Sequence, residues 1–134
     1  MKVFIDATLY IYLNTLSDSR IRRVYERYYI DLLLKNKVYT DVLVLDEIIY
    51  ISKKKYNIPY SLTLDFIQSH ITPYTNIIPL GEDEYEIASK IINKYNIKPS
   101  DALHIGAMKN NNINVIITED KEFDKINDIE RVWL

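Results

Sequence analysis

The segment NVIITEDKEFD, from Asn114 to Asp124, joins a short apolar run to four carboxylates. The run VIIT (residues 115–118) does not alternate polar and apolar residues, so it is typical of a strand that is buried on both faces. Near the N-terminus, KVFI (residues 2–5) has the same character and ends at Asp6. Apolar strands separated by helical segments indicate a mainly parallel sheet with helices on both sides. We therefore expect an α/β fold in three layers, α/β/α.

The rest of the chain divides into segments with strand or helix character. Two further strands are expected, at NIIPL (residues 76–80) and at RVWL (residues 131–134). Hydrophobic periodicity and cap residues predict six helices. Their expected spans are residues 8–16, 19–35, about 41–55, 61–71, 82–95 and 100–110. The caps are expected to be Thr8 for the first helix, Thr40 or Asp41 for the third and Ser100 for the sixth. In the second helix the expected buried face is Ile21, Val24, Tyr28 and Leu32, and in the fifth it is Tyr85, Ala88, Ile91, Ile92 and Tyr95.

The composition indicates a folded globular protein. The chain has 134 residues, 48% hydrophobic and 27% charged, which fits one domain over residues 1–134. It has no cysteine, so disulfides and thiolate metal sites are excluded, and a reducing cytoplasm is expected. Asp6 interrupts the first apolar stretch, and no run reaches the ~20 apolar residues of a membrane span, so we expect neither a signal peptide nor a membrane partner.

Acids from three distant segments lie where the predicted fold would bring them together. Asp6 follows one strand, Glu119 and Asp120 follow another, and Asp101 lies in the first turn of a helix. Because ligand sites of open α/β sheets lie at the carboxyl ends of the strands, these acids are expected to share one crevice. Clustered carboxylates favour hard divalent ions such as Mg²⁺ or Mn²⁺. Taken singly, each acid is also compatible with a turn, a cap or a helix-dipole role.

The chain resembles the PIN-domain ribonucleases, and among them the VapC-type toxins of toxin-antitoxin pairs. The matching pieces are FIDATLYIYL (residues 4–13), DEII (residues 46–49) and PSDALHIGAMKNNNINVIITEDKEF (residues 99–123). The resemblance implies a catalytic and metal-binding site of Asp6, Glu47, Asp101 and Asp120. It selects Glu47, whereas the residues alone do not distinguish Glu47 from Asp46. Secondary candidates are Thr8, Thr118, Glu122 and Asp124.

The function implied by this resemblance is that of an endoribonuclease dependent on Mg²⁺ or Mn²⁺. It further implies an RNA substrate, a homodimer and a cognate antitoxin. The net charge of −2 offers no general attraction for nucleic acid, so local features would have to bind it. One alternative is a catalytically inactive PIN-like module that binds RNA or a partner. Another is an aspartate-based phosphotransfer domain, but Thr8 stands where such a domain would have a second aspartate.

Two residues next to the expected site carry further expectations. His104 lies one turn after Asp101 and could approach the acids, although a structural hydrogen bond is the commoner role for a histidine on a helix. Gly106 stands where the family commonly has Ala, and it predicts close packing of the last helix against a neighbour.

Overall fold

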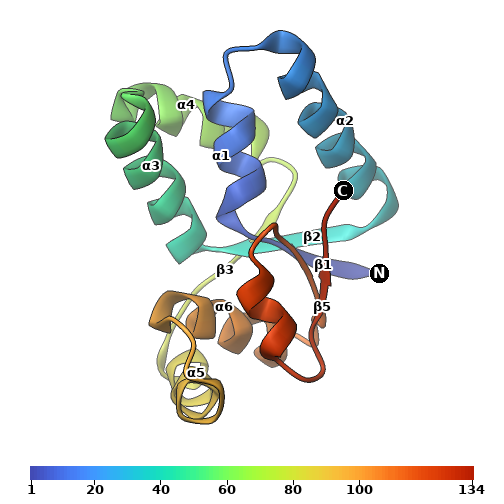
Figure 1. Ribbon diagram of the computed structural model, residues 1–134, viewed down its shortest axis with the longest axis vertical. Helices are drawn as coiled ribbons and strands as arrows, with labels where there is room; N and C mark the ends of the chain where they lie inside the picture. Colours follow the sequence, from blue (N-terminus) through green and yellow to red (C-terminus); the bar gives the residue numbers. More distant parts are fainter.

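The computed structural model describes residues 1–134, and its centre is a five-stranded sheet in the order β3-β2-β1-β4-β5 (Figure 1). All four strand pairs are parallel. The strands are β1 (Lys2–Ile5), β2 (Lys37–Asp41), β3 (Asn76–Ile78), β4 (Val115–Ile117) and β5 (Glu130–Val132). The expected α/β fold with a parallel sheet is therefore confirmed.

Helices cover both faces of this sheet. One layer holds α1 (Ala7–Thr15), α2 (Ser19–Lys35), α3 (Val42–Tyr56) and α4 (Tyr60–His70), and the other holds α5 (Glu82–Tyr95) and α6 (Pro99–Asn110) (Figure 1). A short 3₁₀ helix, η1 (Lys121–Lys125), follows β4. The six helices lie within one or two residues of their expected bounds, and the three layers are confirmed. No helix combines the length and hydrophobicity that a bilayer crossing would need.

The sequence did not predict β2, and this strand changes the role of Thr40. Residues 37–41 read KVYTD, and their polar ends hide the strand character of the segment. Thr40 is not a helix cap but a strand residue, whose buried hydroxyl donates to the carbonyl oxygen of Ile5 at 2.9 Å. Asp41 is the cap of α3, because its Oδ1 accepts from the Val44 N–H at 2.9 Å.

Two other expected caps were wrong. Helix α1 begins at Ala7 rather than Thr8, and its N-cap is Asp6, whose Oδ1 accepts from the Ala7 N–H at 2.9 Å. Helix α6 begins at Pro99, and its N-cap is Lys98 rather than Ser100. Proline is well suited to the first turn of a helix because it lacks an N–H that would otherwise be unsatisfied.

The expected buried faces are only partly correct. In α2, Leu32 is buried, whereas Ile21 and Val24 are each about half exposed. In α5, Ala88 and Ile91 are buried but Tyr85 is 63% exposed. Periodicity identifies a stripe of apolar residues, but it does not say how far the neighbouring helices extend over that stripe.

Close packing at Gly106 is confirmed, and it joins the two helices of the second layer. A Cβ atom placed on Gly106 would lie 2.5 Å from the carbonyl oxygen of Glu84 in α5. Glu84 is itself buried, and its side chain accepts hydrogen bonds from the Gly81 N–H and from Asn110. The absence of a side chain at residue 106 thus fixes how closely α6 approaches α5, and with it where the start of α6 lies beside the sheet.

Candidate metal centre

Asp6 and Thr118 lie side by side where the two central strands end. The parallel register of β1 and β4 pairs Ile5 with Ile117, and the Asp6 N–H donates to the Ile117 carbonyl oxygen at 3.1 Å. Oδ1 of Asp6 caps α1, and Oδ2 accepts from the Thr118 hydroxyl at 2.9 Å. Both oxygens of this buried carboxylate are therefore held in a fixed direction before any ligand binds.

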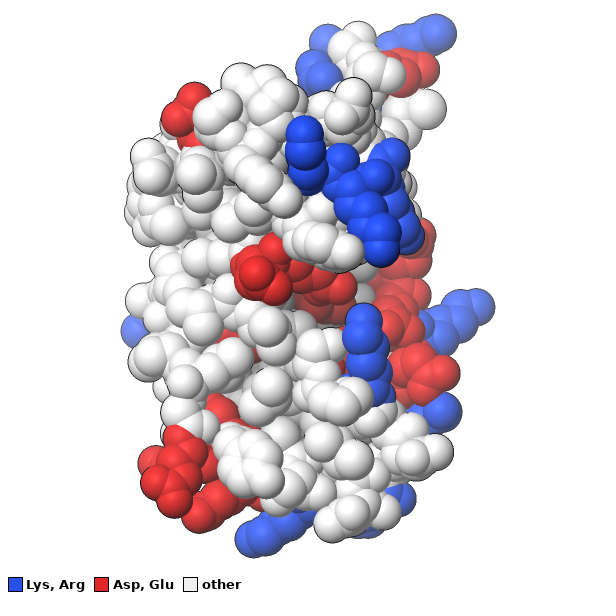
Figure 2. Space-filling view, turned by 90° about the vertical axis from the view of Figure 1, so that its left-hand side faces the viewer, with Lys and Arg blue, Asp and Glu red and all other residues white.

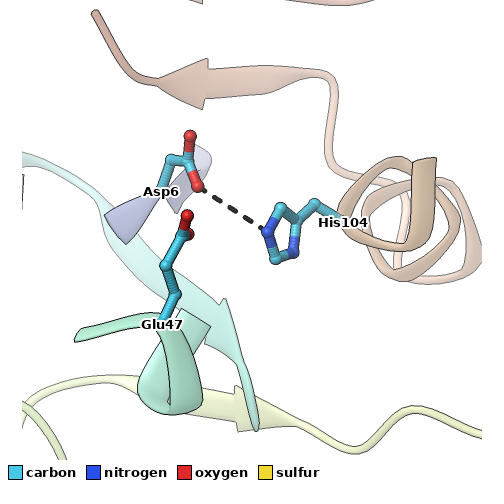
Figure 3. A group of neighbouring side chains, drawn as sticks. All are labelled: Asp6, Glu47 and His104. Carbon is cyan, nitrogen blue, oxygen red and sulfur yellow. Dashed lines mark ion pairs between the residues drawn. The ribbon is translucent and has the colours of Figure 1, made fainter. Parts of the chain in front are cut away.

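Glu47 reaches the same place from α3. Its carboxylate points toward Asp6, and His104 of α6 faces both acids (Figure 3). One ligand atom from each of these three residues lies within 4.8 Å of the other two. Burial raises the pKa of Glu47, and the negative charge of Asp6 raises it further. The adjacent Asp46 is exposed, so Glu47 is the acid of this pair that α3 turns toward Asp6.

Asp101 and Asp120 lie farther out but share the electrostatic environment of the group. Asp101 lies in the first turn of α6, and burial raises its pKa to about 6, helped by the charges of Asp6 and Asp120. The charge of Asp120 also raises the pKa of Glu47. Asp120 caps η1, and its N–H donates to the Thr118 hydroxyl at 3.1 Å. Neither acid belongs to the close group of three, which comprises Asp6, Glu47 and His104.

His104 is the residue at this site that the expected acidic set did not include. Its side chain is 1% exposed, and its Nδ1 lies 2.7 Å from Oδ2 of the fully buried Asp41. Its Nε2 lies 3.7 Å from Oδ1 of Asp6. Burial alone would lower the pKa of His104, but the hydrogen bond and charge of Asp41 outweigh it, with help from Asp6 and Asp101, and raise the pKa to about 9. The structural hydrogen bond is confirmed, and the histidine also faces the acids.

The sequence contained one indication of this placement. Residues three apart on a helix lie on the same face, so a histidine three residues after Asp101 points in a similar direction. The contact of His104 with Asp41 could not be predicted in this way, because Asp41 belongs to the unpredicted strand β2 and lies 63 residues away in the sequence.

The secondary candidates have different surroundings. Thr118 contacts both Asp6 and Asp120, as described above. Thr8 lies half-buried in the first turn of α1, and no hydrogen bond joins it to these acids. Glu122 is exposed and pairs with Lys125 at 2.6 Å, and Asp124 is exposed and pairs with Arg131 at 2.9 Å.

The donor set fits a divalent cation. On the face of the molecule where the strands end, Asp and Glu side chains gather in a hollow at its middle, with Lys and Arg side chains around them (Figure 2). Burial and the charge of Asp6 raise the pKa of both Glu47 and Asp101, and the charges of His104 and Lys98 offset part of this rise. Carboxylate oxygens with one imidazole nitrogen make a ligand set that binds Mg²⁺, Mn²⁺ or a related ion.

Comparison with known proteins agrees with this geometry. Residues 3–129 match the family described as PIN domain. Among curated proteins the sequence has no match.

Several solved structures share the fold. VapBC2 from Rickettsia felis, bound to a DNA fragment from its promoter, has a TM-score of 0.76 and 18% identity, and the match covers 100% of this chain and 99% of that chain. VapC20 from Mycobacterium tuberculosis, a toxin that cleaves the sarcin-ricin loop, has a TM-score of 0.73 and 16% identity, over 91% and 92% of the two chains. VapBC-1 from nontypeable Haemophilus influenzae has a TM-score of 0.71 and 22% identity, over 98% and 97%. At these identities the likeness establishes the fold.

Proposed function

This chain belongs to the PIN domain family, and we propose that it is a metal-dependent endoribonuclease that acts as the toxin of a toxin-antitoxin pair. The observation that carries the proposal is the meeting of Asp6 and Glu47, from distant segments, at the carboxyl ends of the central strands. The charge of Asp120 reaches the same place, because it raises the pKa of both Glu47 and Asp101. A stable fold gains nothing from gathering carboxylates that repel one another. Such a group is accounted for when its charge serves to hold a cation.

The proposed metal ligands are Asp6, Asp101 and Asp120, with Glu47 contributing directly or through water. An ion bound there, Mg²⁺ or Mn²⁺, would supply the positive charge that phosphodiester hydrolysis needs to polarise the phosphate and offset the charge that develops on it. The chain supplies orientation. Asp6 is fixed by its helix cap and by Thr118, and Thr118 also binds the backbone next to Asp120.

Lys98 is the basic residue best placed to bind substrate at this site. Its positive charge lowers the pKa of both Glu47 and Asp101, so it acts on acids from two different helices. Its side chain is exposed, and it forms no ion pair. We assign to Lys98 a contact with a phosphate next to the one that is cleaved, because an unpaired ammonium beside an acidic pocket keeps the phosphate backbone from being repelled.

The proposed substrate is RNA, in keeping with VapC20, which cleaves the sarcin-ricin loop. The proposed partner is an antitoxin, since several structures that share this fold are VapBC complexes. A second copy of the chain is proposed from the resemblance to VapC-type toxins. An open apolar groove between α1, α2 and α4, about 810 Å³ in volume, supports a protein partner. Ile30 and Leu34 line it, and they are 53% and 78% exposed.

The proposal is tested by incubating the purified protein with mixed RNA and Mn²⁺ or Mg²⁺, with and without chelator. Asp101→Asn should reduce cleavage by roughly 100-fold or more, because the loss of a ligand removes several kcal/mol of charge stabilisation. Asp65→Asn is the matched control, because Asp65 is an exposed acid on α4. Cleavage that persists in chelator and in Asp101→Asn would refute the metal-dependent nuclease.

The alternative is a catalytically inactive PIN-like module that binds RNA or a partner. The same preparation decides between the two. Binding of RNA by the wild type without any cleavage, in either Mn²⁺ or Mg²⁺, would establish the inactive module. Cleavage that is lost in Asp101→Asn and kept in Asp65→Asn would exclude it.

A further inference from the structure

We propose that α3 carries a binding site for single-stranded RNA, in which one base stacks on Tyr50 and a neighbouring phosphate contacts Lys54. This inference deepens the proposed function and rests on it in that RNA is the substrate. It concerns the surface that holds the strand beside the acidic site, and not the acids or their ion.

Tyr50 and Lys54 lie on the side of α3 that also carries Glu47. They follow Glu47 by three and seven residues, so the three side chains lie within about 60° of one another around the helix axis. With a rise of ~1.5 Å per residue, Tyr50 and Lys54 lie roughly 5 Å and 11 Å along the axis from Glu47. The Cα–Cβ bonds of a helix tilt toward its N-terminus, which is the end of α3 nearer the acids. A strand whose phosphate is held at the acids can therefore extend to both residues.

The Tyr50 ring and the Lys54 ammonium form a pair on the surface. Tyr50 is 51% exposed, and Nζ of Lys54 lies 5.3 Å from the centroid of its ring. This distance is that of a cation–π contact, which keeps the ammonium beside the ring. Each nucleotide of an RNA strand offers the complementary pair, because a flat base and a negative phosphate are neighbours. Aromatic rings stack on unpaired bases whatever their sequence, and lysine binds phosphate as a point charge.

The same pairing recurs where α3 is followed by α4. Nζ of Lys53 lies 5.9 Å from the ring centroid of Tyr60, which is 52% exposed. Lys53, Lys54 and Lys55 are exposed and form no ion pair. The helix end is already capped, because the Asn57 N–H donates to two carbonyl oxygens of the last turn. The helix dipole favours lysines here, but it does not account for two half-exposed rings beside them.

This surface is continuous with the acidic site. Helix α3 begins at the carboxyl end of β2 and runs away from the sheet (Figure 1). Seen from that side of the molecule, Lys and Arg side chains border the acidic hollow (Figure 2). Because the chain has a net charge of −2, it attracts nucleic acid only through such local features. A single strand offers both phosphates and free base faces, whereas a duplex keeps its base faces within its own stack.

The test measures the affinity of the full chain for a short labelled single-stranded RNA of mixed sequence by fluorescence anisotropy, in chelator so that the RNA is not cut. Tyr50→Ala should weaken binding by about 5-fold or more, because it removes the stacking partner of one base. Tyr50→Phe should bind within about twofold of the wild type, since stacking needs the ring and not the hydroxyl. Tyr85→Ala is the matched control, because Tyr85 is 63% exposed on α5, in the other helix layer.

An RNA of the same length without bases separates stacking from charge. Tyr50→Ala should bind this RNA as tightly as the wild type does, because there is no base to stack. Lys54→Gln should weaken binding of both RNAs, and it should reduce the slope of log affinity against log salt concentration by roughly 0.7. Lys90→Gln is its control, because Lys90 is an exposed lysine on α5.

Equal affinity of the wild type, Tyr50→Ala and Lys54→Gln for the mixed-sequence RNA would overturn the inference. An equal loss in Tyr50→Ala on the RNA without bases would also overturn it. Sedimentation of the same proteins adds a third such outcome. If Tyr50→Ala weakens self-association and leaves RNA affinity unchanged, the surface belongs to a second copy of the chain.

These outcomes are separable from failure of the proposed function. Metal-dependent cleavage of RNA that neither Tyr50→Ala nor Lys54→Gln alters refutes only the site on α3. Binding of RNA that is lost in Tyr50→Ala and kept in Tyr50→Phe, by a protein that cleaves no RNA, supports the site on α3 and refutes only the nuclease.

Discussion

The hydroxyl of Thr118 donates to Oδ2 of Asp6 at 2.9 Å, and this contact joins an acid near the N-terminus to a residue near the C-terminus. The hydroxyl oxygen of Thr118 also accepts from the Asp120 N–H at 3.1 Å. Thr118 is fully buried at the end of β4. A single hydroxyl thus sets the direction of the Asp6 carboxylate and the backbone from which Asp120 projects.

Replacing Thr118 by Val should therefore damage both stability and metal binding. The two side chains have the same shape, but Val leaves Oδ2 of Asp6 and the Asp120 N–H without their partner. Leaving buried polar groups unpaired should lower the free energy of unfolding by about 1–3 kcal/mol, measured by urea titration in chelator. Calorimetry should show Mn²⁺ affinity reduced by about 10-fold.

Thr118→Ser is the control for this substitution because it keeps the hydroxyl and loses only a methyl group. Its Mn²⁺ affinity should stay within about twofold of the wild type, since the loss of affinity follows the hydrogen bond that orients the ligand and not the methyl group. Equal affinities for the Val and Ser variants would show that the hydroxyl does not position these acids.

The fold followed from the sequence where local patterns and packing agree. VIIT and KVFI were predicted as buried strands because no polar residue interrupts their apolar runs, and the structure has strands there. Helix α2 begins and ends at the residues where its hydrophobic periodicity begins and ends. Strand β2 was missed because its burial depends on neighbours. Tyr39 and Thr40 become buried between β1 and β3 only when the sheet assembles. The segment KVYTD has no run of apolar residues that would predict this burial.

The site was predictable to the extent that strand ends carry it. The rule that ligands bind at the carboxyl ends of parallel strands predicts Asp6 and the pair Glu119 and Asp120, and the resemblance selects Asp120 from that pair. The choice of Glu47 over Asp46 needed a resemblance, because one residue along α3 turns a side chain by about 100° and the apolar neighbours of both acids look alike. The contact of Asp41 with His104 could not be predicted, since it joins an unrecognised strand to a helix 63 residues later.

Asp101→Asn should stabilise the metal-free protein at neutral pH. The pKa of Asp101 is raised to about 6 in the folded state, above the 3.8 of the unfolded chain, so its contribution to stability is present below pH 3.8 and is lost as pH rises through 6. Asn does not ionise. In chelator, the variant should be near the wild type at pH 4 and about 1–2 kcal/mol more stable at pH 7, after discounting for solvent screening of this half-buried acid.

Urea titrations at several pH values between about 4 and 7.5 check this expectation. Added Mn²⁺ should reverse the order, because the wild type gains binding free energy that the variant gains less of. A difference between the two proteins that does not change with pH would show that the ionisation of Asp101 costs nothing in the folded state.

The acids that follow Asp120 should matter much less than Asp120 itself. Glu122 and Asp124 are exposed and already pair with Lys125 and Arg131. Exposed ion pairs contribute at most about 1 kcal/mol, so Glu122→Gln and Asp124→Asn should change stability little and Mn²⁺ affinity by less than about threefold. Asp120→Asn should lower the affinity by about 10-fold or more. Isothermal titration calorimetry with Mn²⁺ compares the three variants directly. Equal losses of affinity in all three would show that Asp120 is not the metal ligand of this segment.

Gly106→Ala should destabilise the protein even though alanine is the better helix former. The new Cβ would lie 2.5 Å from the backbone carbonyl oxygen of Glu84, and a backbone atom cannot move aside as the end of a side chain can. Helices α5 and α6 would have to separate, at a cost of about 1–3 kcal/mol. Gly81→Ala is the control, because its Cβ would meet nothing closer than Oε1 of Glu84 at 3.7 Å, and it should cost less than about 1 kcal/mol. Urea unfolding measures both, and a Gly106→Ala protein as stable as the wild type would show that α6 can shift without loss. Since α6 carries Asp101 and His104, any such shift should also appear as weaker binding of Mn²⁺.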